Sequence, residues 1–224
     1  MSFNLSYLWD CLVSGAHYIH ISLLLALVPL AVGTVFGTLI ALSRIFHVRF
    51  VARFFDIVIP IYNGVPVIVT LFIYNLVYLI YCKPSTGGIM YVALFTFCLG
   101  DTMRLAETIR GAFLSVPRGQ YEACYSAGLT VSQALRRVII PQVIPAAIPP
   151  FTNMTVGAIK NSSIVLAIGI TDVLNGATMP CANTYSFLEG YVAAAIIYWI
   201  LNIIAENIFK LAERHFLRYK GGKN

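Results

Sequence analysis

Long apolar runs separated by short polar segments dominate this sequence. An α-helix rises 1.5 Å per residue, so about 20 apolar residues cross the ~30 Å hydrocarbon core of a bilayer. Runs of about this length predict four membrane spans, and a fifth, the third along the chain, begins near Ile89. The other four are roughly Ile19–Leu42, Ile57–Tyr81, Val143–Ile170 and Phe187–Phe209. We therefore expect an all-α integral membrane protein, with about five transmembrane helices in a single domain over residues 1–224.

The composition argues against an ordinary soluble domain. The chain is 59% hydrophobic and 11% charged, with a mean hydropathy of +0.82, so its outer surface is expected to face lipid. The net charge of +6 does not indicate a nucleic-acid partner, because the basic residues sit at the ends of apolar segments rather than on one polar face. We expect no cleavable signal peptide, because no basic region precedes the long first run. The five cysteines lack CxxC pairing and histidine spacing, so no metal site is expected.

Lysine and arginine residues are concentrated on alternate flanks of the predicted spans. Because cytoplasmic flanks are rich in Lys and Arg, this asymmetry places the amino terminus outside and the carboxy terminus in the cytoplasm. The flanks expected outside contain only Lys83. The three basic flanks contain Arg44, Arg49 and Arg53; then Arg110, Arg118, Arg136 and Arg137; and finally Lys210, Arg214, Arg218, Lys220 and Lys223.

The third span carries charge at membrane depth. Only twelve apolar residues, about 18 Å of helix, precede Asp101. Arg104, Glu107 and Arg110 follow at intervals of three, so the four side chains share one side of a helix. Charges at this depth line a pathway or neutralise one another. The sequence favours these two readings equally: a pore lining, or a self-neutralising ladder at a subunit interface.

The fourth span is expected to be broken. Pro145, Pro149 and Pro150 punctuate its start, and the polar run 160–163 interrupts its middle. Proline removes a backbone donor, and broken helices in mid-membrane commonly line a substrate path. A kink with Lys160 snorkelling to the surface is the alternative. We favour the path, because the cytoplasmic flank is many residues from Lys160.

A polar segment at about 115–141 separates the third and fourth spans. Pro117 opens it, and helix formers continue to Gly128, which suits a helix-ending position with positive φ. Thr130-x-x-Gln133 is a capping-box pattern that predicts a second short helix, which Pro141 stops. Arg136 and Arg137 would favour the negative pole of that helix. The pattern predicts two short helices at an angle, with Glu122 exposed, that dock on a partner; an amphipathic hairpin on the membrane surface is the alternative.

The spacing in this segment resembles the "EAA" loop of ABC-importer permeases, which docks on an ATPase subunit. That loop reads Glu-Ala-Ala, three residues, Gly, nine residues, Ile-x-Leu-Pro. Cys124 stands for the second Ala, Val138 for Ile and Ile140 for Leu. The resemblance implies that the docking residues are Glu122, Ala123, Cys124, Gly128, Val138, Ile140 and Pro141.

Further motifs, in the same order and spacing, resemble permeases of the polar amino-acid ABC importers over nearly the whole chain. The motifs are 107–111 with 115–120, 135–142, Lys160-Asn161-Ser162-Ser163-Ile164 and Asn63-Gly64-Val65-Pro66. The resemblance implies a type I ABC-importer fold with a cytoplasmic coupling helix, in the cell membrane of a bacterium. It also implies import of a polar L-amino acid, a second permease subunit, identical or homologous, two ATPase subunits and an extracytoplasmic solute-binding protein.

The chain itself is expected to be a conduit rather than an ATPase. It contains no GxxxxGK[ST] run to cradle phosphates, so ATP and Mg are expected on the partner and no cofactor on this chain. Two positions depart from the family pattern: Asn63 stands for the usual Arg, and Arg104 stands where an aromatic residue is common. The candidate pathway residues are Asn63, Asp101, Arg104, Glu107, Lys160, Asn161 and Ser162.

Two other functional classes are weaker. A non-transporting membrane scaffold or sensor would not need the broken fourth span or the intact loop. A membrane enzyme lacks support, because the histidines are scattered over different flanks and no nucleophile or metal set surrounds Asp101 and Glu107. Cys82 and Cys181 fall on flanks expected outside, where an oxidised pair is geometrically possible but two free thiols are expected.

Overall fold

The chain folds into a bundle of helices. The computed structural model describes residues 3–82, 86–182 and 185–221, which form helices and no strands; Lys83 and Lys223 lie outside these ranges. Short π and 3₁₀ segments occur at Leu135–Ile139, Ser162–Ile168 and Met179–Ala182. The α-helices are α1 (Leu5–His17), α2 (Ile19–Ile45), α3 (Arg49–Asn63), α4 (Val67–Tyr81), α5 (Thr86–Leu114), α6 (Arg118–Ser126), α7 (Val131–Ala134), α8 (Ile140–Asn161), α9 (Val173–Thr178) and α10 (Phe187–Gly221).

Three helices are long and apolar enough to cross a membrane, and two bent helix pairs raise the number of candidate spans to as many as five. The expected all-α membrane fold is confirmed. The three long helices are Ile19–Ile45, Gly87–Leu114 and Phe187–Arg214. The bent pairs are Arg49–Asn63 with Val67–Tyr81, at 99°, and Val131–Ile168 with Val173–Ala182, at 65°.

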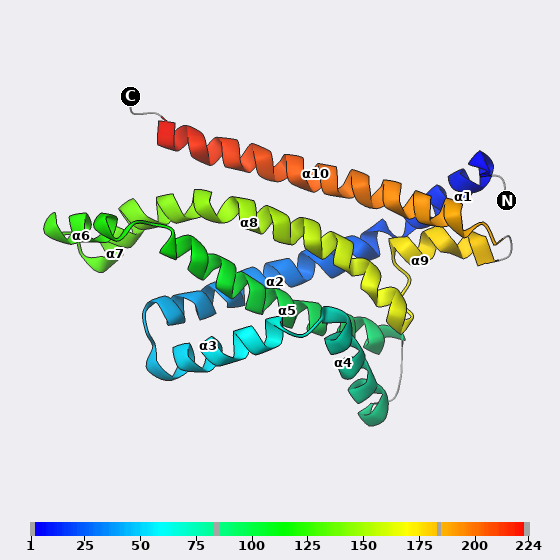
Figure 1. The fold of residues 1–224 in the computed structure, drawn as a ribbon, viewed down its shortest axis with the longest axis horizontal. Helices are drawn as coiled ribbons and strands as arrows, with labels where there is room; N and C mark the ends of the chain where they lie inside the picture. Colours follow the sequence, from blue (N-terminus) through cyan, green and yellow to red (C-terminus); the bar gives the residue numbers. More distant parts are fainter. Residues whose placement is uncertain (1–2, 83–85, 183–184, 222–224) are drawn as a thin grey trace.

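The second predicted span is not one helix. α3 and α4 meet at Gly64–Pro66 and turn by 99°, so the predicted run Ile57–Tyr81 is divided between them. Pro66 has no backbone N–H and disfavours helical geometry at the residue before it, so α3 ends ahead of it and α4 begins after it. The resulting corner lies beside α5 (Figure 1).

The prolines of the fourth span do not break it. α8 continues through Pro145, Pro149 and Pro150 to Asn161. The interruption comes at Ser162, where the α-helix gives way to a 3₁₀ turn that ends at Gly169 with φ +85°. The polar run therefore marks the change of helix type, as expected, and the prolines only reduce the hydrogen bonding within α8.

α2 and α5 form the centre of the bundle. A Cβ atom at Gly33 would lie 2.9 Å from the backbone carbonyl carbon of Asp101, and one at Gly37 would lie 2.9 Å from the backbone nitrogen of Ala106. Glycine at both positions therefore lets the two backbones approach closely, as small residues do between membrane helices. This packing fixes the charged face of α5 relative to α2.

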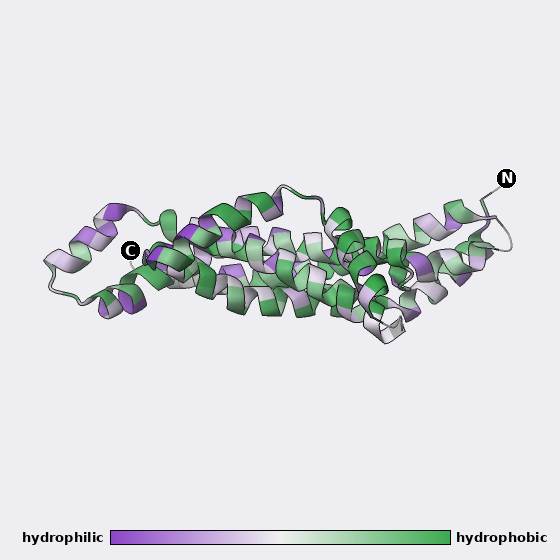
Figure 2. Ribbon diagram, turned by 90° about the horizontal axis from the view of Figure 1, so that it is seen from below, coloured by the Kyte–Doolittle hydropathy of each residue, from purple (hydrophilic) through white to green (hydrophobic). Residues whose placement is uncertain are grey.

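The long helices lie side by side along the molecule, and the polar segment projects from one end (Figure 1). We name the end that carries α6 and α7 the loop end, and the opposite end the α1 end. The carboxy end of α10 lies at the loop end, whereas α1 and α9 lie together at the α1 end (Figure 1). Hydropathy follows this division, since hydrophilic residues are frequent in the projecting segment and apolar ones cover the long helices (Figure 2).

The outer faces of the long helices are apolar. Phe36 and Leu39 on α2 are 54% and 58% exposed, and Trp199 and Ile208 on α10 are 65% and 60% exposed. A water-soluble domain rarely exposes a contiguous apolar surface of this extent, but lipid covers such a surface without cost. The fold therefore fits a membrane-embedded chain.

Candidate functional site

The polar segment at the loop end is anchored by its own apolar cluster. Phe113 and Val116 at the end of α5 pack against Ile139 and Val143, and all four are buried. Tyr121 from α6 and Val138 from the π segment pack against this cluster. The segment is therefore held on the bundle through its base, and its outer helix remains free to contact a partner.

α6 ends as predicted. Gly128 has φ +75°, the left-handed conformation that glycine adopts without a Cβ penalty. Its N–H donates to the Tyr125 carbonyl at 3.0 Å, and the Leu129 N–H donates to the Cys124 carbonyl at 3.0 Å, which is the Schellman arrangement. Glu122 and Ala123 are exposed on α6, whereas Cys124 is buried, so the helix presents one face outward.

The second short helix begins with the predicted capping box. The Thr130 N–H donates to Gln133 Oε1 at 2.9 Å, and the Gln133 N–H donates to Thr130 Oγ1 at 3.3 Å. These two bonds satisfy backbone donors that have no partner within the helix. The sequence therefore specifies both the end of α6 and the start of α7.

The prediction that Pro141 stops this helix is wrong. α7 continues through the π segment Leu135–Ile139 into α8, and Pro141 lies in the first turn of α8. The wider π turn accommodates a proline that would clash with the preceding carbonyl in a regular α-helix. Arg136 and Arg137 consequently lie inside a continuous stretch of helix. The expected interaction of these two residues with the negative pole of a helix end therefore does not apply.

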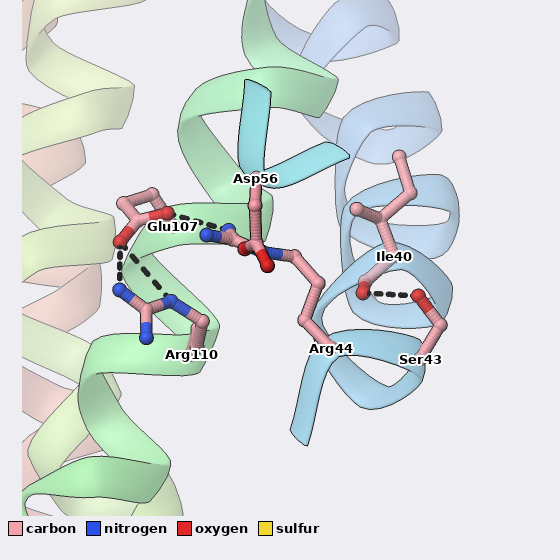
Figure 3. Close-up of polar contacts among 6 residues, drawn as sticks. All are labelled: Ile40, Ser43, Arg44, Asp56, Glu107 and Arg110. Carbon is pink, nitrogen blue, oxygen red and sulfur yellow. Dashed lines mark hydrogen bonds and ion pairs between the residues drawn. The ribbon is translucent and has the colours of Figure 1, made fainter. Parts of the chain in front are cut away.

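The charged residues of α5 form two separate groups rather than one ladder of four. Arg104 pairs with Asp101 at 3.3 Å, and Arg110 pairs with Glu107 at 2.6 Å. Glu107 also accepts from Arg44 of α2 at 2.6 Å, as Figure 3 shows. Arg44 and Arg110 therefore neutralise the Glu107 carboxylate within an ion-pair cluster towards the loop end of α5. Glu107 does not line the cavity described next, which Arg104 lines.

A cavity of about 420 Å³ lies at the corner between α3 and α4. This volume is within the range of small-molecule sites. Asn63 and Arg104, the two positions that depart from the family pattern, both line it. The remaining lining residues are Tyr62, Val65, Pro66, Val67, Thr70 and Gly100.

Asp101 and Asn161 lie next to this cavity. Both line a narrow gap of about 10 Å³ that they share with Arg104 and Val67. Asp101 is 6% exposed, so its carboxylate faces the interior of the bundle. Three of the predicted pathway residues, Asn63, Asp101 and Asn161, therefore line spaces that they share with a fourth, Arg104.

Lys160 is not part of this constellation. It lines a different groove of about 510 Å³ between α8 and α10, which it shares with Tyr198, Asn202 and Glu206 among others. Ser162 is fully buried, donates its hydroxyl to the Ile159 carbonyl at 2.8 Å and lines neither space. A pathway role for Lys160 stays a prediction, and the position of Ser162 within the 3₁₀ turn indicates a structural role.

Sequence reasoning missed a buried polar anchor. Asp172 is fully buried, caps α9 through the Asn175 N–H at 3.1 Å and accepts the Tyr198 hydroxyl at 2.5 Å. Ser22 accepts from the Val173 N–H at 3.2 Å. The spacing from Asp172 to Asn175 is an N-cap pattern that could have located this anchor.

The structure has no disulfide among the five cysteines, and Cys82 and Cys181 are free thiols, as expected. Cys82 is exposed, whereas Cys181 is buried with its sulfur 3.6 Å from that of Cys11. Within residues 3–82, 86–182 and 185–221, no group of three His, Cys, Asp or Glu side chains is arranged to hold a metal ion.

A membrane bundle with a cavity at a broken helix and a projecting two-helix segment defines the membrane subunit of a transporter. The family described as "Binding-protein-dependent transport system inner membrane component" matches residues 33–218, so the chain belongs to this family. The protein is accordingly a transport subunit of an inner membrane rather than a catalytic enzyme.

Named relatives and solved structures agree. The chain is 32% identical over 224 residues to the L-cystine transport system permease protein TcyL of Bacillus subtilis, covering 95% of this chain and 91% of TcyL. It is 31% identical over 223 residues to the octopine transport system permease protein OccM of Rhizobium radiobacter, covering 95% and 90%. A crystal structure of an amino acid ABC transporter with histidines matches with a TM-score of 0.85 and 25% identity, over 96% of this chain and all of that one.

Proposed function

We propose that this chain is the permease subunit of an ATP-driven importer for a polar L-amino acid. The observation that carries the proposal is the cavity at the corner between α3 and α4, where Arg104 is available to a ligand beside the buried carboxylate of Asp101. Relatives named as amino-acid, cystine and octopine permeases support the same substrate class.

An amino-acid zwitterion needs partners of both signs once it leaves water. The Arg104 guanidinium can donate charge-assisted hydrogen bonds to the substrate carboxylate. The Asp101 carboxylate and the Asn63 and Asn161 amides can then face the ammonium and the polar side chain. The Asp101–Arg104 pair at 3.3 Å neutralises both charges, and a bound zwitterion would replace this one ion pair by two, one with each side chain.

The α6–α7 segment is proposed as the coupling element. Exposed Glu122 lies on a short helix that Gly128 closes at its carboxy end, and it can dock on an ATPase subunit, which would bind the ATP and Mg. The complete importer would contain two ATPases, a second permease subunit, identical or homologous, and an extracytoplasmic solute-binding protein. In this arrangement the loop end and the end of α10 face the cytoplasm, and α1 faces outward, in the membrane of a bacterium.

A non-transporting scaffold or sensor is the competing function. A scaffold needs no substrate cavity, so the cavity at the corner between α3 and α4 is the feature that separates the two functions. Uptake of a labelled amino-acid panel into vesicles containing the whole complex is the decisive measurement. ATP-dependent uptake of one polar amino acid supports the importer, and a complex that hydrolyses ATP without taking up any amino acid supports the scaffold.

Copurification tests the proposed assembly separately. ATPase subunits and a second permease retained with this chain after membrane extraction support the arrangement. A chain that is extracted alone under conditions that preserve uptake overturns it.

A further inference from the structure

Two cysteines distant in sequence meet at the α1 end. The sulfur atoms of Cys11 on α1 and Cys181 in the 3₁₀ segment Met179–Ala182 lie 3.6 Å apart, although 170 residues separate them. Each cysteine is only 1% exposed. At this distance the two thiols share a hydrogen bond, in which either sulfur can be the donor.

The surroundings leave the two sulfurs facing each other. Ala177, Ala193 and Ala194 surround the pair with small side chains. A Cβ atom at Gly190 would lie 2.7 Å from the Cys181 sulfur, so α10 packs directly against it. A disulfide has an S–S distance of about 2.05 Å, and a movement of about 1.5 Å by the two side chains would close the gap.

We propose that Cys11 and Cys181 form a disulfide that links α1 covalently to the segment after α9. The proposal rests on the orientation given under the proposed function, in which the α1 end lies outside the cytoplasm. Disulfides form and persist in that compartment and are rare in the cytosol. The link would fix the amino-terminal helix to the end of the fourth span.

The oxidation requires an external disulfide of the small-molecule or oxidoreductase class. One cysteine thiolate attacks it and forms a mixed disulfide with release of one thiol. The second cysteine thiolate then displaces the other thiol, so two protons and two electrons leave the protein and the oxidant becomes two thiols.

Burial governs when this exchange takes place. Burial, with Cys181 adding to the effect, raises the pKa of the Cys11 thiol to about 12, so Cys11 is almost wholly protonated near neutral pH. Both cysteines are also only 1% exposed, so we expect the bond to form before α1 packs on its neighbours. Once packed, it lies out of reach of reductants in solution.

The test counts oxidised cysteines in membranes trapped with acid. Free thiols are blocked with N-ethylmaleimide in detergent denaturant, and the protein is then reduced and labelled with a maleimide-polyethylene glycol. The wild type is expected to gain two polymer additions. Cys11→Ala and Cys181→Ala should gain none, and the control Cys82→Ser, which removes an exposed cysteine, should still gain two.

A second readout uses the folded protein. A membrane-impermeant phosphine added to intact, outward-facing membranes should leave both additions in place, whereas the same reductant after denaturation should abolish them. A wild type that gains no addition overturns the disulfide, and loss of both additions in the folded state overturns its proposed inaccessibility.

An accessibility tag at Asn4 separates this proposal from the orientation on which it rests. No additions with the tag outside overturn the disulfide alone. Two additions with the tag inside overturn the orientation and leave the disulfide standing. No additions with the tag inside overturn both.

Discussion

Arg44 on α2 donates to the Glu107 carboxylate on α5 at 2.6 Å, across 63 residues of sequence. The same guanidinium donates to Asp56 of α3 at 2.7 Å, and the Arg44 side chain is only 7% exposed (Figure 3). One buried cation therefore joins three helices where α5 approaches the loop end. This relationship gives the base of the projecting segment a fixed position in the bundle.

Replacing Arg44 by Met should destabilise the bundle. The change leaves Glu107 and Asp56 without this cation, but their side chains are 42% and 57% exposed and Glu107 keeps Arg110. We therefore expect a loss of about 1–2 kcal/mol rather than the 3–5 kcal/mol of a fully buried pair. Thermal unfolding in detergent should show a midpoint lowered by about 2–8 °C.

The exposed pair Lys210–Glu206 supplies the control, since its members are 58% and 46% exposed. Glu206→Gln should change the midpoint by about 1 °C or less. Equal shifts in the two variants would mean that Arg44 does not stabilise the helix junction more than a surface pair does.

Changes in the α6–α7 segment should uncouple the importer without removing it from the membrane. Glu122→Lys reverses an exposed charge at the proposed ATPase contact, which costs several kcal/mol if the partner is complementary. Gly128→Pro forces φ to about −65° where the chain has +75°. Uptake and ATPase retention should fall by about tenfold or more in both.

Asp10→Lys is a matched charge reversal on an exposed residue at the opposite end, and it should retain both activities. Membrane levels of all three variants are compared by immunoblot. Normal uptake and ATPase retention in both loop variants would exclude the docking role.

The details of this segment were predictable because they are local. Gly128 and the pair Thr130 and Gln133 act through neighbours within five residues, so their backbone geometry follows from side-chain chemistry alone. The role of Pro141 was not predictable. Whether a proline ends a helix or is absorbed by a π turn depends on the packing of Ile139 and Val143 against α5, which the local sequence does not specify.

The residues that line the cavity could be predicted from the sequence only in part. The sequence marked Asn63 and Arg104 as unusual, but only the 99° corner at Pro66 brings them to one space. Lys160 is predicted to belong to the pathway because it lies in an interrupted span far from the cytoplasmic flank, yet it lines a separate groove between α8 and α10. The sequence identifies candidate pathway residues, but it does not determine which face of a helix points towards the pathway.

We expect the amino terminus to lie outside and the carboxy terminus to lie in the cytoplasm. The structure puts α1 and the end of α10 at opposite ends of the bundle, which fits an odd number of spans (Figure 1). Single cysteines at Asn4 and Asn224, in a Cys82→Ser background that removes the exposed native thiol, would report each side by impermeant maleimide labelling. Labelling of both positions from the same side would contradict this topology.

Lys160→Met tests whether the groove between α8 and α10 belongs to the pathway. We expect substrate-stimulated uptake to fall while basal ATP hydrolysis persists, because a cation at this depth is retained for function. Complex yield by size exclusion is measured beside uptake. Full yield with unchanged uptake would remove Lys160 from the pathway, and lost yield would favour a structural role beside Glu206.

Arg104 is expected to bind the substrate carboxylate. Because Arg104 also pairs with Asp101, variants of the two residues can distinguish substrate binding from a purely structural role. Arg104→Gln removes a charge-assisted contact of about 1.5–3 kcal/mol, so uptake should fall by about 10- to 150-fold. The variant also leaves the Asp101 carboxylate buried and unpaired, so the yield of complex should fall as well.

Combining Asp101→Asn with Arg104→Gln removes the unpaired charge and should restore the yield without restoring uptake. Arg104→Lys, which keeps the charge but loses the planar fork, should give intermediate uptake. If the double variant recovers both yield and uptake, the pair serves only to neutralise itself, and the substrate carboxylate must be bound elsewhere.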